Sequence, residues 1–181
     1  MELTKSEDID VLISAEEIEE RNRELADRIE SDYADSKLHV IGVLKGCFVF
    51  LSDLVRKLDM DVSIDFLGLS SYGDTTKSSG VVRMTQDLSE PIEGKQVLVV
   101  EDIIDTGLTM QYLLENLQTR HPESISVCTL LHKPENQEVD VPIHYKGFAI
   151  PDRFVVGYGL DYAEYYRNLP FIGYVPGLDD E

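Results

Sequence analysis

The sequence predicts an α/β protein built on a twisted, mainly parallel sheet that is covered by helices on both faces. Apolar segments of strand length alternate with helical patterns between residues 38 and 131, and strands that are joined by helices form parallel sheets. The chain has 181 residues, which suits one domain with a full hydrophobic core. No apolar run approaches the roughly 18 residues that a membrane span requires, so no membrane partner is expected.

The first predicted elements alternate between helices and strands. Residues 14–33 are expected to be helical because Ser14 and Glu17 have the spacing of a capping box and apolar residues follow on one face. Three further elements follow, namely a buried strand at 38–44, a helix at 46–58 and a strand at 62–72.

Residues 71–80, "SYGDTTKSSG", are almost entirely small and polar and contain no hydrophobic anchor. Such a composition predicts a mobile surface loop. The remaining predicted elements are a strand at 95–100, a helix at 108–120, a strand at 125–131 and a short last strand at 153–160. In a parallel sheet, ligands bind beyond the carboxyl ends of the strands, so the segments that follow the strands are the candidate site.

The chain carries 16 Lys and Arg against 35 Asp and Glu, and its net charge is −19. A field of this sign repels nucleic acids, so a nucleic-acid partner is not expected. The N-terminus, "MELTKSEDID", lacks the apolar core of a secretory signal. Cys47 and Cys128 lie in apolar stretches without metal-ligand spacing, which predicts buried, reduced thiols and a cytoplasmic location.

In "VLVVEDIIDTGLT" (97–109), an apolar strand runs directly into three carboxylates and a turn of small residues. Backbone N–H groups at a helix start lack intrahelical partners, and the helix dipole favours an anion there. Gly107 allows the backbone to approach closely, and the hydroxyls of Thr106 and Thr109 add donors, so the turn is a candidate phosphate site. The alternative is an ordinary helix N-cap formed by Asp105 or Thr106.

Glu101 and Asp102 stand at the edge of the core, where a carboxylate is costly unless it has partners. Adjacent strand residues point to opposite faces, but at a strand end both can turn toward a ligand above the sheet. Their oxygens accept hydrogen bonds from sugar hydroxyls or bind a metal indirectly, so the phosphate turn and the acid pair together describe a ribose 5-phosphate site. A phospho-acceptor receiver domain also has an acid pair, but without the D-T-G turn, and is the weaker alternative.

The same 13 residues resemble the phosphoribosyl pyrophosphate-binding motif of the type I phosphoribosyltransferases. Three other stretches resemble segments of the hypoxanthine (hypoxanthine-guanine) phosphoribosyltransferases within that family. "GVLKGCFVF" resembles their pyrophosphate loop, "SSYG…SSG" their flexible closing loop, and "FVVGYGLDYAEYYRNLPFIGY" their C-terminal hood. The motifs occur in order over roughly residues 8–175, and together they are far more specific than any one of them.

The resemblance implies a purine salvage enzyme that joins hypoxanthine or guanine to phosphoribosyl pyrophosphate, with Mg²⁺ as cofactor. Asp105 is implied as the general base near N7 of the purine. The implied ribose 5-phosphate site consists of Glu101, Asp102, Thr106, Gly107, Leu108 and Thr109. The two acids hold the ribose hydroxyls. Some family members carry a cation at the position of Leu108, so phosphate binding in this chain is expected to depend more on backbone N–H groups.

The implied pyrophosphate site consists of Lys45, Gly46, Ser71, Tyr72 and Arg167. In the family, the peptide between Leu44 and Lys45 can be cis. Asp161, with Glu101 and Asp102, is implied in Mg²⁺ binding, and an acid within "GYGLDYAEYY" is otherwise unusual because its neighbours are aromatic or apolar. Taken without the resemblance, Lys45 is an ordinary surface lysine at a strand end.

The implied purine site involves three residues. Lys133 donates to the 6-oxo group, Phe154 stacks on the base, and the backbone of Val155 meets its Watson–Crick edge. Without the resemblance, Lys133 fits a solvated lysine before a proline turn, and Phe154 fits a core aromatic. The loop at 71–80 is implied to close over the site and exclude water.

The resemblance further implies a single domain over residues 1–181, with a small hood contributed by the N-terminal residues and roughly 134–181, and a homodimer or homotetramer. Two other functions are disfavoured. Some proteins with this fold bind RNA as regulators, which the net charge disfavours. A pyrimidine or adenine transferase is disfavoured by "FVVGYGLDY". The sequence leaves hypoxanthine, guanine and xanthine unranked as substrates.

Overall fold

The computed structural model describes residues 8–34, 36–71 and 82–176. Within these ranges, the centre of the molecule is a six-stranded sheet in the order β4-β3-β2-β5-β6-β7, in which every neighbouring pair is parallel except β3 and β4. The strands are β2 (Leu38–Leu44), β3 (Val62–Ser71), β4 (Val82–Gln86), β5 (Gln96–Ile104), β6 (Ser124–His132) and β7 (Tyr145–Ala149). The mainly parallel sheet predicted from the sequence is confirmed.

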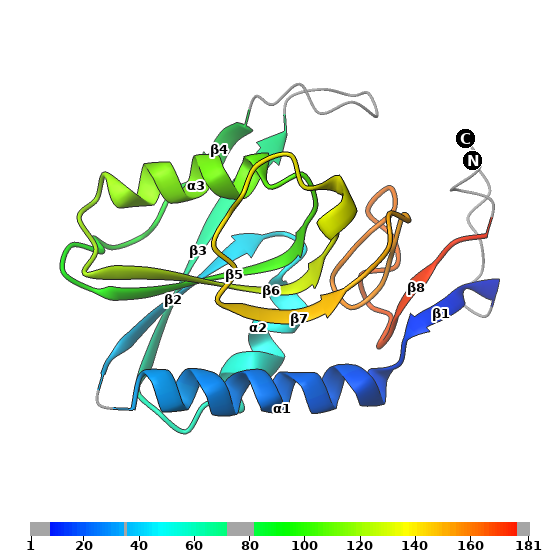
Figure 1. Ribbon diagram of the computed structural model, residues 1–181, viewed down its shortest axis with the longest axis horizontal. Coiled ribbons are helices and arrows are strands. Elements are labelled where there is room, and N and C mark those ends of the chain that lie inside the picture. The colour runs from blue at the N-terminus through cyan, green and yellow to red at the C-terminus, as the bar shows by residue number, and fades with distance from the viewer. Residues whose placement is uncertain (1–7, 35, 72–81, 177–181) are drawn as a thin grey trace.

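Helices cover both faces of this sheet, as Figure 1 shows. The helices are α1 (Ala15–Asp32) and α2 (Phe48–Val55) on one face and α3 (Leu108–Gln118) on the other. Leu98 and Val100 of β5 belong to the apolar cluster under α1 and α2, whereas Val97 and Val99 belong to the cluster under α3. All four are fully buried, because β5 lies between two covered faces and its side chains alternate between them.

α1 begins at the predicted capping box. Glu17 donates its backbone N–H to Ser14 Oγ at 3.2 Å, and Ser14 donates its own N–H to Glu17 Oε2 at 2.8 Å. Two backbone donors that the helix itself does not satisfy therefore gain partners. The face that α1 turns to the sheet carries Ile18, Leu25 and Ile29, which are buried.

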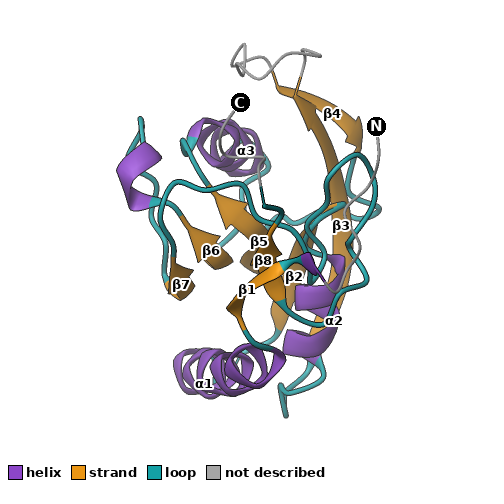
Figure 2. Cartoon of the chain, turned by 90° about the vertical axis from the view of Figure 1, so that its right-hand side faces the viewer, coloured by secondary structure: helices purple, strands orange, loops and turns teal. Residues whose placement is uncertain are grey.

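A second, smaller sheet joins the two ends of the described chain, as Figures 1 and 2 show. β1 (Asp10–Ile13) pairs antiparallel with β8 (Ile172–Tyr174). A separate apolar cluster supports this unit and consists of Ile9, Val156, Tyr166, Leu169 and Val175. The arrangement agrees with a small hood formed by terminal segments. Residues 145–149, however, fall within the range expected for the hood and instead form β7 at the edge of the main sheet.

The predicted strand at 153–160 is wrong. Gly157, Tyr158 and Gly159 have φ angles of 100°, 49° and 105°, and positive φ is incompatible with a strand. Only isolated bridges form there, between Val156 and Gly173 and between Gly157 and Leu160. The apolar composition of this stretch reflects burial in the C-terminal segment rather than membership of a sheet.

Other element boundaries also differ from the predictions. α2 is shorter than the expected 46–58, because residues 45–47 form a turn before it, whereas β5 runs past the expected end at 100 and includes the acid pair. Residues 72–81, which hold nearly all of the loop predicted at 71–80, lie outside the described residues. The strands β1, β4, β7 and β8 were not predicted.

Both cysteines are buried free thiols, as expected. None of the helices in the described ranges is both long and apolar enough to cross a membrane.

Replacing Ser14 by alanine tests the capping box. The variant loses the acceptor for the Glu17 N–H, and we expect urea denaturation to show a free energy of unfolding lower by about 1 kcal/mol, the usual cost of a lost serine N-cap. Ser31→Ala, at an exposed position in the last turn of α1, is the matched control and should change stability by less than about 0.5 kcal/mol. Equal effects of the two substitutions would mean that the cap contributes nothing.

Candidate functional site

The carboxyl ends of β2, β5 and β6 meet at one edge of the sheet, facing the C-terminal segment, residues 150–176 (Figure 1). The chain leaves these strands at Lys45, Asp105 and Lys133. The Lys133 N–H donates to the carbonyl of Ile104 at 3.0 Å, which ties the end of β6 to the end of β5. Three segments that the sequence analysis singled out separately are therefore neighbours.

The turn between β5 and α3 is held by its backbone. Gly107 is the N-cap residue of α3, with φ of 85° and no side-chain cap hydrogen bond, so the alternative of an ordinary cap by Asp105 or Thr106 is wrong. A Cβ atom on Gly107 would lie 2.8 Å from the carbonyl oxygen of Val139. The carbonyl of Thr106 accepts from Glu138 N at 2.9 Å, which buttresses the turn from outside.

A cavity of about 200 Å³ lies over this turn. Its lining includes Glu101, Asp105, Thr106, Gly107 and Thr109. The N–H groups at the start of α3 and the two threonine hydroxyls can donate hydrogen bonds to an anion. The carboxylates beside them can accept hydrogen bonds from hydroxyl groups of the same ligand. Leu108 does not line the cavity; its N–H lies 3.4 Å from Thr106 Oγ1.

The acid pair lies inside β5 and not beyond its end. Glu101 lines the cavity over the turn, and Asp102 does not. The Asp102 carboxylate packs directly on the backbone of the β2–α2 loop, since a Cβ atom on Gly46 would lie 1.6 Å from Asp102 Oδ2. Only glycine fits at position 46 while Asp102 keeps this place.

Glu101 is the more buried of the two acids and is only 8% exposed. Burial raises the pKa of its carboxyl well above the ordinary value, and the neighbouring carboxyl of Asp102 raises it further. The Asp102 N–H, at 3.3 Å from Glu101 Oε1, acts in the opposite direction. The Glu101 carboxyl is therefore set up to hold a proton, or to meet a hydroxyl donor or a cation, at the edge of the core.

A larger cavity of about 690 Å³ adjoins the first, because Val43, Leu44, Leu69 and Glu101 line both. Its lining also includes Lys45, Gly46, Asp102, Asp161, Glu164 and Arg167. The loop after β2 thereby faces the C-terminal segment across a hollow lined by both cations and carboxylates. The peptide between Leu44 and Lys45 is cis.

Ion pairs order the side chains around this larger cavity. Lys45 Nζ lies 3.0 Å from both carboxylate oxygens of Glu164, and this pairing lowers the pKa of Glu164. Arg167 Nη2 lies 2.8 Å from Asp161 Oδ1, and Arg167 Nη1 donates to the carbonyl of Gly159 at 2.9 Å. Both cations are held near the position where a charged ligand in the cavity would meet them.

Lys133 joins the turn between β5 and α3 to the C-terminal segment. It is 7% exposed, and its Nζ lies 3.4 Å from Asp105 Oδ2 and 3.3 Å from Asp152 Oδ1. Its interpretation as a solvated lysine is therefore wrong. Asp105 Oδ1 accepts a further hydrogen bond from Asn136 Nδ2 at 3.0 Å, so both of its oxygens are oriented.

Phe154 and Val155 follow Asp152 along the chain. Phe154 is 43% exposed and makes an edge-to-face contact with Tyr162 at 5.7 Å between ring centroids. It is therefore not a core aromatic. Val155 is buried. Neither residue lines the two cavities, but the segment that carries both is tied to Asp105 through Lys133.

Of the remaining predicted residues, Ser71 ends β3, and Tyr72 lies outside the described residues. Sequence reasoning missed Asn136, Asp152 and Glu164, which contact Asp105, Lys133 and Lys45. None has a periodic or motif signal. Only the proximity of Asn136 to Lys133, and of Glu164 to Asp161, could have indicated them.

No group of three or more His, Cys, Asp or Glu that could hold a metal by itself occurs among the described residues. Four carboxylates nevertheless line the larger cavity, namely Glu101, Asp102, Asp161 and Glu164. This fits Mg²⁺, which proteins bind through one or two carboxylates together with substrate phosphates and water.

The sequence profile of the phosphoribosyl transferase domain matches residues 12–163. The chain is 51% identical over 168 residues to a hypoxanthine-guanine phosphoribosyltransferase of Dictyostelium discoideum, which covers 91% of this chain and 93% of the relative. It is 49% identical over 163 residues to that of Bacillus subtilis strain 168, covering 90% and 91%. The crystal structure of a hypoxanthine-guanine phosphoribosyltransferase from Bacillus anthracis superposes with a TM-score of 0.88 at 51% identity, covering 92% of this chain and 98% of that one.

Glu101→Gln tests the electrostatics of the acid pair without reference to any reaction. Because the folded protein raises the pKa of Glu101, wild-type protein loses stability as the pH rises above the ordinary glutamate value of 4.5, whereas glutamine cannot ionise. Urea denaturation in a chelator, between about pH 5 and about pH 8, should show the variant gaining stability relative to wild type as the pH rises. Parallel pH profiles of the two proteins would contradict the raised pKa.

Proposed function

The chain belongs to the phosphoribosyl transferase family, and on this premise we propose that it transfers the 5-phosphoribosyl group of phosphoribosyl pyrophosphate to hypoxanthine or guanine. The products are IMP or GMP and pyrophosphate. The observation that carries the proposal is the cavity over the turn from Asp105 to Thr109, where helix-start donors and the carboxylate of Glu101 lie side by side. Relatives that match over nine-tenths of their length are named for this activity.

The 5′-phosphate binds at the start of α3. Backbone N–H groups of the turn and the hydroxyls of Thr106 and Thr109 donate to its oxygens, and the helix dipole favours its charge. Leu108 contributes only its backbone. Glu101 and Asp102 accept hydrogen bonds from the ribose hydroxyls, and the raised pKa of Glu101 makes a hydroxyl or cation partner favourable there.

The pyrophosphate group lies in the larger cavity, between Lys45 and Gly46 on one side and Arg167 on the other. Lys45 is paired with Glu164, so a pyrophosphate must compete with that carboxylate for the ammonium group. The Lys45–Glu164 pair is largely exposed, and such pairs contribute little stability, so the exchange costs little. Arg167 is less exposed and keeps its orientation through Gly159.

Mg²⁺ is the cofactor implied by the family. Asp161, with Glu101 and Asp102, would hold it in the larger cavity beside the pyrophosphate site. When bound, it supplies charge neutralisation for the highly anionic leaving group.

The purine is placed against Lys133, Phe154 and Val155. Lys133 donates to the 6-oxo group, the exposed side chain of Phe154 stacks on the ring, and the Val155 backbone meets the Watson–Crick edge. Asp105 accepts the proton that the base loses as its nitrogen attacks C1′. Asn136 holds one oxygen of that carboxylate, which leaves the acceptor in a fixed direction.

The remaining partners follow from the same proposal. The ligands are small anionic molecules and a purine base, and the net charge of −19 opposes a nucleic-acid partner. The family resemblance supports a homodimer or homotetramer, which sedimentation analysis would identify. The buried free thiols support a cytoplasmic location.

One assay tests the function. Purified protein is incubated with Mg²⁺, phosphoribosyl pyrophosphate and each of hypoxanthine, guanine, xanthine and adenine, and nucleotide and pyrophosphate are measured. Formation of IMP or GMP in step with pyrophosphate is expected. Absence of nucleotide with every base would overturn the proposal.

Asp105→Asn removes the proton acceptor and keeps an oxygen that can accept from Asn136. We expect kcat of the forward reaction to fall by about 10²–10⁴, with little change in KM for phosphoribosyl pyrophosphate. Asp140→Asn, at an exposed loop position, is the matched control and should leave kcat unchanged. Wild-type turnover of the Asp105 variant would remove this residue from the mechanism.

Lys133→Met tests base selection. Lys133 offers donors only, which suits the 6-oxo group of hypoxanthine and opposes the 6-amino group of adenine, and a buried site of this kind can discriminate by about 10⁴–10⁵. The variant should lose most of its kcat/KM for hypoxanthine while its low kcat/KM for adenine changes little. The adenine rate serves as the internal control. An unchanged ratio of the two kcat/KM values would contradict the assignment of Lys133 to the 6-oxo group.

A further inference from the structure

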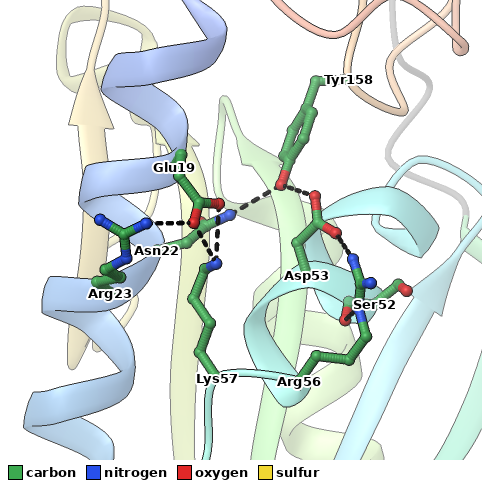
Figure 3. Close-up of polar contacts among 8 residues, drawn as sticks. All are labelled: Glu19, Asn22, Arg23, Ser52, Asp53, Arg56, Lys57 and Tyr158. Carbon is green, nitrogen blue, oxygen red and sulfur yellow. Dashed lines mark hydrogen bonds and ion pairs between the residues drawn. The ribbon is translucent and has the colours of Figure 1, made fainter.

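The hydroxyl of Tyr158 connects the C-terminal segment to the two helices that cover one face of the sheet (Figure 3). Asn22 of α1 donates from Nδ2 to this hydroxyl at 2.8 Å, and the hydroxyl donates to Asp53 Oδ2 of α2 at 2.6 Å. Asn22 is fully buried and Tyr158 nearly so. Residues separated by more than a hundred positions in the chain thus meet at one oxygen atom.

Ion pairs flank this hydroxyl. Asp53 pairs with Arg56, the residue that follows α2, and Glu19 of α1 accepts from Lys57 at 2.7 Å. Figure 3 shows these pairs on either side of the hydroxyl. Burial raises the pKa of Tyr158 far above its ordinary value, and the hydrogen bond to Asp53 raises it further, so the hydroxyl stays protonated and donates.

Tyr158 is also the non-glycine member of an unusual backbone turn. It has φ of 49° between two glycines at 100° and 105°, and left-handed backbone is disfavoured for a residue with a Cβ atom. Such a conformation persists where several contacts hold it at once. Here the side-chain hydroxyl is fixed by two partners, and the Tyr158 N–H donates to the carbonyl of Leu169 at 2.9 Å.

The next residue, Gly159, contacts both segments that face each other across the larger cavity, namely the C-terminal segment and the loop after β2. Its carbonyl accepts from Arg167 Nη1 at 2.9 Å, and its N–H donates to the Arg167 carbonyl at 2.9 Å. On its other side, a Cβ atom on Gly159 would lie 2.1 Å from the carbonyl oxygen of Gly46. The backbone of Gly159 therefore sets where Arg167 stands and presses against the loop that carries Lys45.

We propose that Tyr158 is a positioning residue for the pyrophosphate end of the substrate. Its hydroxyl, fixed by Asp53 and Asn22, holds Gly159 in the place from which Arg167 and the Lys45–Gly46 loop are aligned. This proposal rests on the proposed function for the meaning of the cavity. Tyr158 itself lines neither the larger cavity nor the one over the phosphate turn, so its effect on the binding of phosphoribosyl pyrophosphate is indirect. This effect should be separable from the effect of Tyr158 on stability.

Tyr158→Phe keeps the ring and removes the hydroxyl. The chain offers a matched control in Tyr145, which is also buried and whose hydroxyl also donates to a carboxylate, Asp32 Oδ2 at 2.7 Å, but which lines neither cavity. Both variants should lose stability to a similar extent in urea. Only Tyr158→Phe should raise KM for phosphoribosyl pyrophosphate, by about three- to tenfold, as expected for one lost hydrogen bond. KM for hypoxanthine should stay within about twofold in both.

A double-mutant cycle tests whether Tyr158 and Asp53 act through the same hydrogen bond. Asp53→Ala should reproduce the rise in KM for phosphoribosyl pyrophosphate, and the double variant with Tyr158→Phe should be no worse than either single one, because both changes remove the same contact. Additive effects would overturn the proposal, since they would mean that Asp53 acts on the substrate by another route, for example through Arg56.

Hydrogen exchange gives a readout that does not require activity. The peptide covering residues 156–169 should exchange faster in Tyr158→Phe than in wild type, and Tyr145→Phe should leave it unchanged. If wild-type protein makes no nucleotide, the proposed function fails, and unchanged exchange in the Tyr158 variant would separately overturn the positioning role. If wild type is active and the two tyrosine variants share one KM for phosphoribosyl pyrophosphate, the positioning role alone fails.

Discussion

The whole site depends on the parallel pairing of β5 with β2 on one side and with β6 on the other. Because the three strands run in the same direction, the chain must leave each of them at the same edge of the sheet. β5 is buried on both faces, so its register is fixed by two apolar clusters at once. A slip of one residue would exchange the faces on which Val97 and Val99, and Leu98 and Val100, are buried, so the position of the acid pair that follows them is fixed as well.

Charges in the site are arranged as local pairs within a strongly acidic protein. Lys45 faces Glu164, Arg167 faces Asp161, and Lys133 lies between Asp105 and Asp152. The exposed pairs contribute little to stability, so their importance lies in holding cations at fixed positions until an anionic group competes for them. A net charge of −19 is compatible with the proposed anionic substrates for this reason: at short range the proposed site presents these few oriented cations and the start of α3.

Close backbone contacts fix the positions of the two segments that face each other across the larger cavity. Gly46 lies against the Asp102 carboxylate, and Gly159 lies against the Gly46 carbonyl. Because neither glycine has a side chain, β5, the loop after β2 and the C-terminal segment can pack closely together. The hydroxyl of Tyr158 anchors these packed segments to α1 and α2 through its hydrogen bonds with Asn22 and Asp53. The chain thereby places its cations through packing in a dense interior, where a small displacement at one point is passed to the next.

The sequence by itself determined what depends on neighbouring residues: the capping box of α1, the buried strand at 38–44, the turn of small residues that opens α3, and the order of the family motifs. Those patterns have fixed periods and fixed spacings, so they can be recognised in one chain. Only the tertiary structure decided that Asn136 orients Asp105, that Glu164 pairs with Lys45, and that Tyr158 meets Asn22 and Asp53. The same holds for the stretch at 153–160, whose apolar composition predicts a strand but whose positive φ angles follow from contacts with Leu169 and Gly46. These features are set by residues that are distant in sequence, and no local pattern encodes which distant partner the folded backbone will bring into reach.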